Sequence, residues 1–329
     1  MEAILLNTKH NILLITPKFY GYDTQIYNNL KKRGFDVDLV YLHVQNMIVL
    51  FIFKILAKIS YNLYEKFYNC YYFLSLKNKK YDKIIVISGE TLSRKVIRLL
   101  KTKYLNEDGE IILYIWTPIS RYQQLFETIH LYEKVFSFQQ EDCKKHGFIF
   151  LPNFYSSTLV KQNINERERI FFVGQYRKER YQIIKNLKHA GIPVDAKIYH
   201  SKMFYYIFKV LKYNEYKFVK KEDLIFKPLN NDKVNFYMNS SKAILDIVDK
   251  GQTGLSQRPF DCLYLQKKII TTSKEIKNYN FYNENNIYIL KLINKQEIEN
   301  FMKKKYDNIT DSLCNNYSLD NWLNKILED

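Results

Sequence analysis

Residues 245–272 read LDIVDKGQTGLSQRPFDCLYLQKKIITT, and this stretch holds the parts of one strand–helix–strand unit. The apolar run 242–248, which carries Asp246, and the run KKIITTS at 267–273 both predict buried strands. Between them, two glycines predict a loop, and Pro259 suits the first turn of a helix over 258–266. Two strands joined by a helix predict neighbouring parallel strands in one sheet.

The same alternation continues outward through the second half of the chain. Upstream we expect strands at 169–173, 194–199 and within 220–228, with helices over about 175–190 and 230–241. Downstream we expect a last strand ending at 290 and two helices, over 297–306 and 318–329.

The first half shows the same pattern and therefore predicts a second parallel sheet. Its expected strands lie at 11–16, 36–42, 81–89, 110–118, 132–139 and 148–155, and its helices at 21–33, 90–105 and 141–147. A polar stretch at 157–169 is the predicted linker. We therefore expect an α/β protein with two doubly wound, Rossmann-like domains, residues 1–156 and 157–329, that face a ligand cleft.

The chain is strongly basic, with 51 lysine and arginine residues against 34 aspartate and glutamate residues, a formal charge of +17 over 329 residues. A solvated basic surface is one explanation; attraction to nucleotide phosphates, an anionic membrane or nucleic acid is the other. The four cysteines form no C-x-x-C pair, which favours a reducing, cytoplasmic compartment, and no secretory signal is evident at the N-terminus.

One segment raises the question of membrane binding. Residues 47–57 read MIVLFIFKILA, which is too short to span a bilayer. The segment is either a buried core helix or an interfacial helix. The second alternative rests on residues 58–80, which add lysines and tyrosines of the kind found at a lipid headgroup boundary.

Two motifs offer groups that suit a phosphate. In FFVGQYRKER (171–180), a strand runs into Gly174, and Arg177 and Arg180 lie on the first turns of the helix that follows. A helix N-terminus and a forked guanidinium group both favour an anion. The alternative is an ordinary strand–turn–helix connection with solvated charges, because a single glycine is no G-x-G-x-x-G fingerprint.

The second motif is the loop of the opening stretch, with Gly254, Ser256, Arg258 and Asp261. Its backbone amides and Arg258 suit a phosphate, and Asp261 suits ribose hydroxyls. The alternative is a loop that leads into a buried helix. We favour a site here, because Gly-Leu-Ser-Gln-Arg is not simple turn chemistry.

The order strand, G-L-S-x-R-x-F-D, helix, K-x-I-I-T-T (254–272) resembles bacterial GT-B-type glycosyltransferases of lipopolysaccharide-core and capsule gene clusters. The segments IKNYNFY (276–282), YDKIIVISGE (81–90), YIW (114–116) and FLPNFY (150–155) fit the same group. The resemblance implies that the C-terminal half binds a nucleotide sugar, and it carries the donor role to Gly174, Arg177, Gly254, Ser256, Arg258 and Asp261.

Such enzymes generally need no bound metal, and the six scattered histidines form no cluster, so we expect no metal or other cofactor besides the nucleotide-sugar co-substrate. Asp36-Val37-Asp38 resembles a metal-nucleotide motif of another glycosyltransferase fold. The alternation of a strand places both acids on one face, and a solvated edge is favoured.

Glycosyl transfer also needs a base for the acceptor hydroxyl. Glu90 is the first candidate because it ends a predicted strand, and Asp142 is the reserve together with Glu141. The alternative for each is an acid that merely favours a helix start. Similar sequences often carry acids where this chain has Thr117 and Gln139.

The expected function is transfer of a sugar to a lipid-linked oligosaccharide in surface polysaccharide or lipopolysaccharide synthesis. The expected partners are a nucleotide sugar, that acceptor and an anionic membrane surface, which the protein would meet as a peripheral protein on the cytoplasmic face. One alternative is a non-catalytic assembly partner of the same fold, suggested by Thr117 and Gln139. A nucleic-acid-binding protein is the other, but no RNP, KH or zinc-finger signature is present.

Overall fold

The computed structural model describes residues 10–44, 46, 49, 52, 53, 55, 56 and 59–328. The chain divides into two compact units. Unit 1 comprises residues 1–152 together with 319–329, and unit 2 comprises residues 153–318. Each unit is built around its own parallel six-stranded sheet, which confirms the prediction of two Rossmann-like domains.

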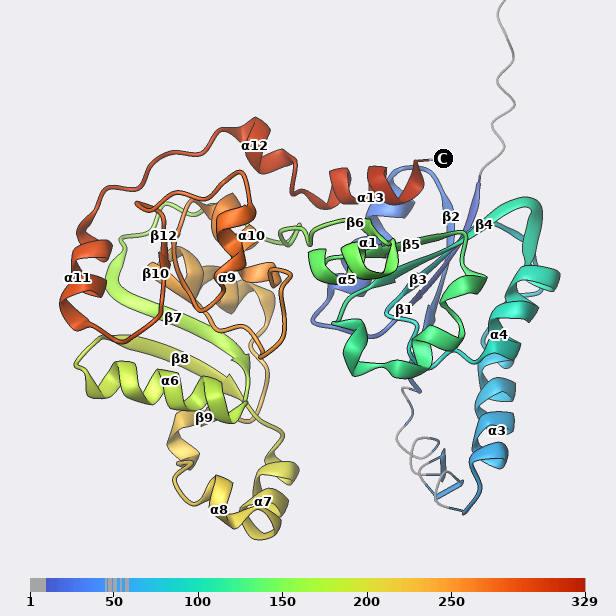
Figure 1. Cartoon of the computed structure of the whole chain (residues 1–329), viewed down its shortest axis with the longest axis horizontal. Coiled ribbons are helices and arrows are strands. Elements are labelled where there is room, and N and C mark those ends of the chain that lie inside the picture. Colours follow the sequence, from blue (N-terminus) through green and yellow to red (C-terminus); the bar gives the residue numbers. More distant parts are fainter. Residues whose placement is uncertain are drawn as a thin grey trace, which may run out of the picture. The chain divides into compact units, whose positions relative to one another are not determined.

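The sheet of unit 1 has the order β2-β1-β3-β4-β5-β6 (Figure 1). Its central strands are buried on both faces, as the continuous apolar runs predict. Leu13 lies between Asp38 and Ile84 in the parallel register. The strands are β1 (Asn11–Thr16), β2 (Asp36–Tyr41), β3 (Tyr81–Ile87), β4 (Leu105–Ile115), β5 (Lys134–Ser137) and β6 (Ile149–Phe150).

Helices cover both faces of this sheet. Apolar side chains of α3 and α4 join one face through Tyr72, Val96 and Ile97. On the other face, α1 contacts α13, and the Trp322 ring lies 4.8 Å from the Tyr114 ring. The helices are α1 (Tyr22–Lys32), α3 (Tyr61–Leu74), α4 (Arg94–Leu99), α5 (Gln140–His146) and α13 (Leu319–Leu327).

Several boundaries differ from the sequence prediction for local reasons. The helix expected over 90–105 begins after Ser93, whose hydroxyl accepts a hydrogen bond from the Val96 amide and caps the first turn. A π-helical turn at Leu100–Tyr104 then leads directly into β4. The strand expected over 148–155 is limited to two residues, Ile149–Phe150.

The sheet of unit 2 has the order β12-β11-β10-β7-β8-β9. Numbered from β7, this is the Rossmann order, which reverses between β7 and β10. The strands are β7 (Arg167–Gln175), β8 (Val194–Tyr199), β9 (Leu224–Ile225), β10 (Ser241–Asp246), β11 (Lys268–Thr271) and β12 (Ile287–Ile289).

The two faces of this sheet carry different helices, because consecutive residues such as Phe171 and Phe172 point to opposite sides. One face packs against α6, α7, α8 and α11, and the other against α9, α10 and α12. The helices are α6 (Lys178–His189), α7 (Lys202–Leu211), α8 (Tyr213–Tyr216), α9 (Asn231–Asn239), α10 (Gln257–Leu265), α11 (Lys295–Lys303) and α12 (Asp311–Asn315).

The end of the chain departs from the predicted domain 157–329. Helix α13 belongs to unit 1, because its apolar residues Trp322, Leu323 and Ile326 are buried there. Arg33, which directly follows α1, also donates hydrogen bonds to the backbone oxygen and side chain of Asp320 at 2.6 and 3.2 Å. Amphipathic spacing predicts this helix but cannot select the sheet that it covers.

The segment 47–57, which we expect to be either a core helix or an interfacial helix, lies largely outside the described residues. Within the described part of the chain, none of the helices is both long and apolar enough to cross a membrane.

Candidate functional site

The sheet of unit 2 changes direction between β7 and β10, and open α/β sheets bind ligands beside the carboxyl ends of strands at such a point. Gly174 is the penultimate residue of β7, and Asp246 ends β10. The loops that leave these strands bring Arg177, Arg180 and Arg258 to the same place. The structure therefore places together the cationic residues that two separate motifs predicted.

Arg258 and Asp246 form the inner layer of this cluster. The Asp246 carboxylate is fully buried, and one oxygen accepts hydrogen bonds from the Ser256 hydroxyl at 2.8 Å and from Arg258 Nη1 at 3.1 Å. The other oxygen accepts from the Thr271 hydroxyl at 2.9 Å. Arg258 Nε and Nη2 donate to the carbonyl of Val173. Arg258 thus ties α10 to β7 and β10.

This arrangement explains Gly174. A Cβ atom at this position would lie 2.8 Å from Nη2 of Arg258 and 3.0 Å from the Phe172 ring. The guanidinium group of Arg258 lies 5.2 Å from the centre of that ring. A side chain at position 174 would therefore displace the guanidinium group of Arg258 or the Phe172 ring from its present place.

Arg180 and Arg177 form the outer layer. Arg180 donates to Asp249 at 2.9 Å and to the carbonyl of Ile247 at 3.2 Å. Burial lowers the pKa of Arg180, and the neighbouring charge of Arg258 lowers it further. Arg177 precedes the first turn of α6; its side chain is 52% exposed and lies 3.6 Å from Asp249. Three guanidinium groups therefore share two carboxylates in this cluster, which leaves positive charge at the solvent-facing edge.

The loop before α10 adds neutral polar groups. Ser256 caps the helix by accepting a hydrogen bond from the Arg258 amide, and the Gln252 side chain holds the carbonyl of Gly254 at 2.8 Å. The side-chain nitrogen of Gln257 is buried and has no hydrogen-bond partner among the described residues.

Asp261 lies on α10, as Arg258 does, but makes a different contact. Its carboxylate accepts a hydrogen bond from the Ser156 amide at 2.8 Å. The residue is only 8% exposed. Burial raises its pKa to about 7, although the Ser156 amide and the Arg258 charge act in the opposite direction. In this structure Asp261 anchors the start of unit 2, and its contact with ribose stays a prediction.

We expect Asp261 to make the stability of the protein depend on pH. Because its pKa is higher in the folded state than in the unfolded chain, the folded state loses stability as pH rises from about 4 to about 7. The Asp261→Asn variant keeps an acceptor for Ser156 and should show a smaller loss. Urea unfolding at about pH 5 and about pH 8 measures the difference, which should be a few kcal/mol.

The exposed Glu222 is the matched control, since Glu222→Gln should leave the pH dependence unchanged. Equal pH profiles for wild type and Asp261→Asn would contradict the expected burial of the charge.

In unit 1, Glu90 follows β3 through a tight turn, in which Ser88 and Gly89 both have positive φ angles, 73° and 70°. One oxygen of Glu90 lies 3.3 Å from Nε2 of His43, which follows β2. The other oxygen is buried and has no hydrogen-bond partner among the described residues. Glu90 also contributes to raising the pKa of Tyr132, after the larger effect of burial. This carboxylate therefore has an unused acceptor beside an imidazole.

The reserve candidate, Asp142, has a different environment. It lies in the first turn of α5, and its carboxylate accepts a hydrogen bond from the Ile119 amide at 3.0 Å. It thus holds the loop that follows β4, which contains Thr117. Gln139 is buried at the start of α5. The structure does not bring Asp142 and Glu90 into one described contact.

Among the described residues, no three histidine, cysteine, aspartate or glutamate side chains form a group that could hold a metal ion. Asp36 and Asp38 share one face of β2, as the alternation predicts, and both contact Lys79, at 2.9 and 2.7 Å. These ion pairs account for the D-V-D motif at the sheet edge.

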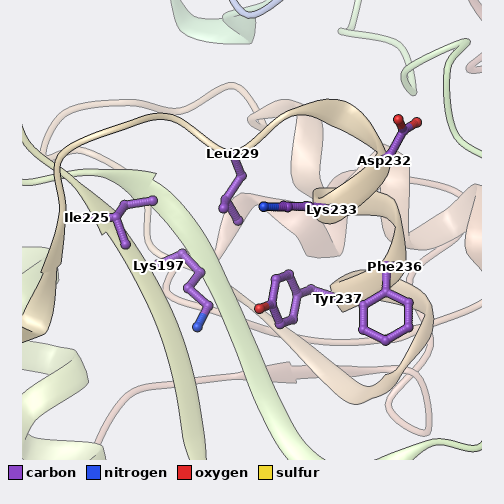
Figure 2. Close-up of a pocket in the computed structure, with 7 residues that line it drawn as sticks. All are labelled: Lys197, Ile225, Leu229, Asp232, Lys233, Phe236 and Tyr237. Atoms are coloured by element: carbon purple, nitrogen blue, oxygen red, sulfur yellow. The ribbon is translucent and has the colours of Figure 1, made fainter.

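A surface pocket of about 470 Å³ lies elsewhere in unit 2, beside α9, the edge strand β9 and its neighbour β8 (Figure 2). Lys197 and Tyr237 face each other across it, with the Lys197 amine 5.0 Å from the ring centre. None of the predicted site residues lines this pocket, whose lining residues are Lys197, Ile225, Leu229, Asp232, Lys233, Phe236 and Tyr237.

Two residues of the candidate sites were missed by reasoning from the sequence. Asp249 follows β10 by three positions, and its place after a buried strand was an available signal. His43 follows β2, but its contact with Glu90 depends on the pairing of β1 with both β2 and β3. No local sequence pattern predicts that contact.

No family model and no curated protein matches this sequence. Solved structures of similar fold do match almost the full chain. A glycosyltransferase from Rickettsia africae ESF-5 is 14% identical with a TM-score of 0.52, over 98% of this chain and 97% of that chain. Anabaena HepE, solved with UDP and glucose, is 9% identical with a TM-score of 0.57, over 97% and 99%.

A Methanocaldococcus jannaschii UDP-GlcNAc 2-epimerase, solved with UDP-GlcNAc and UDP, is 11% identical with a TM-score of 0.53, over 92% of this chain and 97% of that chain. At these identities the likeness shows the fold alone. The fold is of the GT-B type, with two Rossmann-like domains.

Proposed function

We propose that this protein is a glycosyltransferase that moves a sugar from a nucleotide-sugar donor to an oligosaccharide acceptor. The observation that carries the proposal is the arginine cluster at the switch point of unit 2, in a fold whose solved examples hold UDP or a UDP-sugar. The donor phosphates bind at the exposed edge of this cluster, near Arg177 and the N-terminus of α6.

Charge explains how this site serves the reaction. When the bond between sugar and phosphate breaks, negative charge grows on the leaving nucleotide and positive charge on the sugar ring. Arg177 stabilises that leaving group by its guanidinium charge, because its side chain is the most exposed of the three arginines in the cluster. Arg258 acts indirectly by holding the loop and β7 in place.

Glu90 is the proposed base. Its buried, unpartnered oxygen accepts the proton of the acceptor hydroxyl, and His43 holds the other oxygen. We keep Asp142 as a residue that positions the Thr117 loop.

We also propose that the acceptor is lipid-linked, and that the protein works at the cytoplasmic face of an anionic membrane in surface polysaccharide or lipopolysaccharide synthesis. The support is the net charge of +17 and several exposed apolar residues in and before α3. Among them are Ile59, which is 71% exposed, and Leu74, which is 82% exposed.

A thermal-shift series against UDP-, GDP-, CMP- and dTDP-sugars tests donor binding, because a ligand that binds the folded state raises its apparent stability. We expect at least one sugar nucleotide to raise the melting temperature. Arg177→Gln should weaken that donor about tenfold, since it removes a charge-assisted contact with phosphate. Lys188→Gln, at the other end of α6, is the matched control and should bind normally.

The remaining outcomes separate the alternatives. Binding of a donor without transfer of its sugar to an acceptor in any extract would favour a non-catalytic partner of the same fold. Conversion of the sugar nucleotide to an epimer without acceptor would favour an epimerase. No shift with any sugar nucleotide, or equal affinity in Arg177→Gln, would contradict the donor site.

A further inference from the structure

Helix α7 of unit 2 is apolar around almost its whole circumference. Tyr205 and Phe208 point inward and pack with His200 and Tyr216. The Tyr216 hydroxyl lies 2.9 Å from Nε2 of His200. Six further residues of α7 are apolar and exposed: Met203 by 59%, Phe204 by 41%, Tyr206 by 46%, Ile207 by 39%, Val210 by 78% and Leu211 by 75%. A surface helix normally carries polar residues on its exposed face.

The residues that follow extend the same surface. Tyr213 is 63% exposed and Phe218 is 71% exposed. Single exposed apolar residues are ordinary on a protein surface, but eight large ones within sixteen residues are an unusual concentration, and such concentrations mark interaction sites. We call residues 202–221 the α7–α8 surface.

The charges on this surface identify the occupant. Residues 202–221 contain six lysines and a single glutamate. Two lysine amines lie over aromatic rings of the surface, Lys212 at 4.9 Å from the centre of Phe208 and Lys217 at 5.0 Å from Phe218. An apolar helix face with lysines and tyrosines at its border matches the interface of an anionic bilayer.

A second copy of the chain is a poorer match. In a symmetric dimer the same patch contacts itself, and the lysines of one copy would then face those of the other. Like charges brought together in this way oppose association.

We infer that the α7–α8 surface docks unit 2 onto an anionic lipid bilayer, with α7 lying in the interface. This inference uses residues outside the 47–76 segment, and it holds whether or not the protein transfers sugar. Tyr176, which immediately precedes Arg177, belongs to the aromatic cluster beneath α7, at 5.1 Å from His200 and 5.2 Å from Tyr216. Docking would therefore hold the proposed donor site of unit 2 close to the membrane surface.

Co-sedimentation of the full chain with vesicles tests the inference. We compare vesicles of pure phosphatidylcholine with vesicles that contain phosphatidylglycerol. We expect binding to the anionic vesicles that weakens with salt, and at least about a tenfold loss of partitioning in Ile207→Ser/Val210→Ser/Leu211→Ser, because three exposed apolar side chains are lost. Leu292→Ser, which removes an 82% exposed leucine elsewhere in unit 2, should bind normally.

A fluorescent reporter locates the contact independently. Both natural tryptophans, Trp116 and Trp322, are buried, so Leu211→Trp adds an exposed reporter on α7. Its emission should shift to the blue when anionic vesicles are added. The inference is overturned if the triple variant binds like wild type, if the reporter stays in water while the protein binds, or if the chain self-associates through this surface without binding lipid. These readouts need no sugar nucleotide, so failure here leaves the donor site untouched.

Discussion

Glu90→Gln is expected to lower kcat for sugar transfer by about 100-fold to 10,000-fold, the range that general-base catalysis typically contributes. Glutamine preserves the shape of the side chain but cannot take the proton of the acceptor hydroxyl. Donor affinity should be unchanged, because the proposed phosphate site lies on residues of unit 2. A transfer assay with the donor found by thermal shift measures kcat, and the same thermal shift measures donor affinity.

Glu141→Gln is the matched control, because Glu141 is an exposed acid at the start of α5 and should be dispensable. His43→Ala should have a smaller effect than Glu90→Gln, since His43 only holds the carboxylate. Transfer by Glu90→Gln within about threefold of wild type would exclude Glu90 as the base.

Arg258→Met should destabilise the protein by about 3–5 kcal/mol, because the change leaves the buried Asp246 carboxylate without its charge partner. The Ser256 and Thr271 hydroxyls remain as neutral donors and cannot replace the guanidinium charge. Urea unfolding of the unliganded protein measures the loss. The expected result follows from the contacts of Arg258 inside unit 2 and needs no nucleotide.

The double variant Arg258→Met/Asp246→Asn provides the control. It removes the Asp246 charge that Arg258→Met leaves without a partner, so it should recover part of the lost stability. A loss below about 1 kcal/mol in Arg258→Met would show that the buried pair contributes little. Arg177→Gln should leave stability nearly unchanged, because that side chain is half exposed. The roles of the two arginines are therefore separable. Arg258 holds the site together, and Arg177 faces the proposed ligand.

Sequence reasoning succeeded where a signal is local. The runs at 11–16 and 194–199 became strands with the same bounds, and Gly34 with its φ of 93° ends the turn after α1 as expected. The grouping of Gly174, Arg177, Arg180 and Arg258 also followed, because the carboxyl ends of neighbouring parallel strands meet at one edge of a sheet.

It could not predict the contacts that depend on non-local partners. Arg258 was assigned to a phosphate, yet its guanidinium nitrogens bond to Asp246 and Val173. Asp261 was assigned to ribose, yet it bonds to the Ser156 amide. A charged residue near a loop that contains glycines has the same local sequence pattern whether it binds a ligand or bonds to other groups of the protein. Only the packing of α10 against the sheet decides between these two roles.

The alternation of apolar runs with amphipathic segments was enough to establish two parallel sheets, because the periods of strands and helices are local properties of the chain. The tertiary structure alone decided that α13 covers unit 1, that Glu90 meets His43, and that the outer face of α7 stays uncovered. The physical reason is that burial and ion pairing depend on neighbours that are distant in the sequence, and the same apolar helix is core in one packing and exposed surface in another.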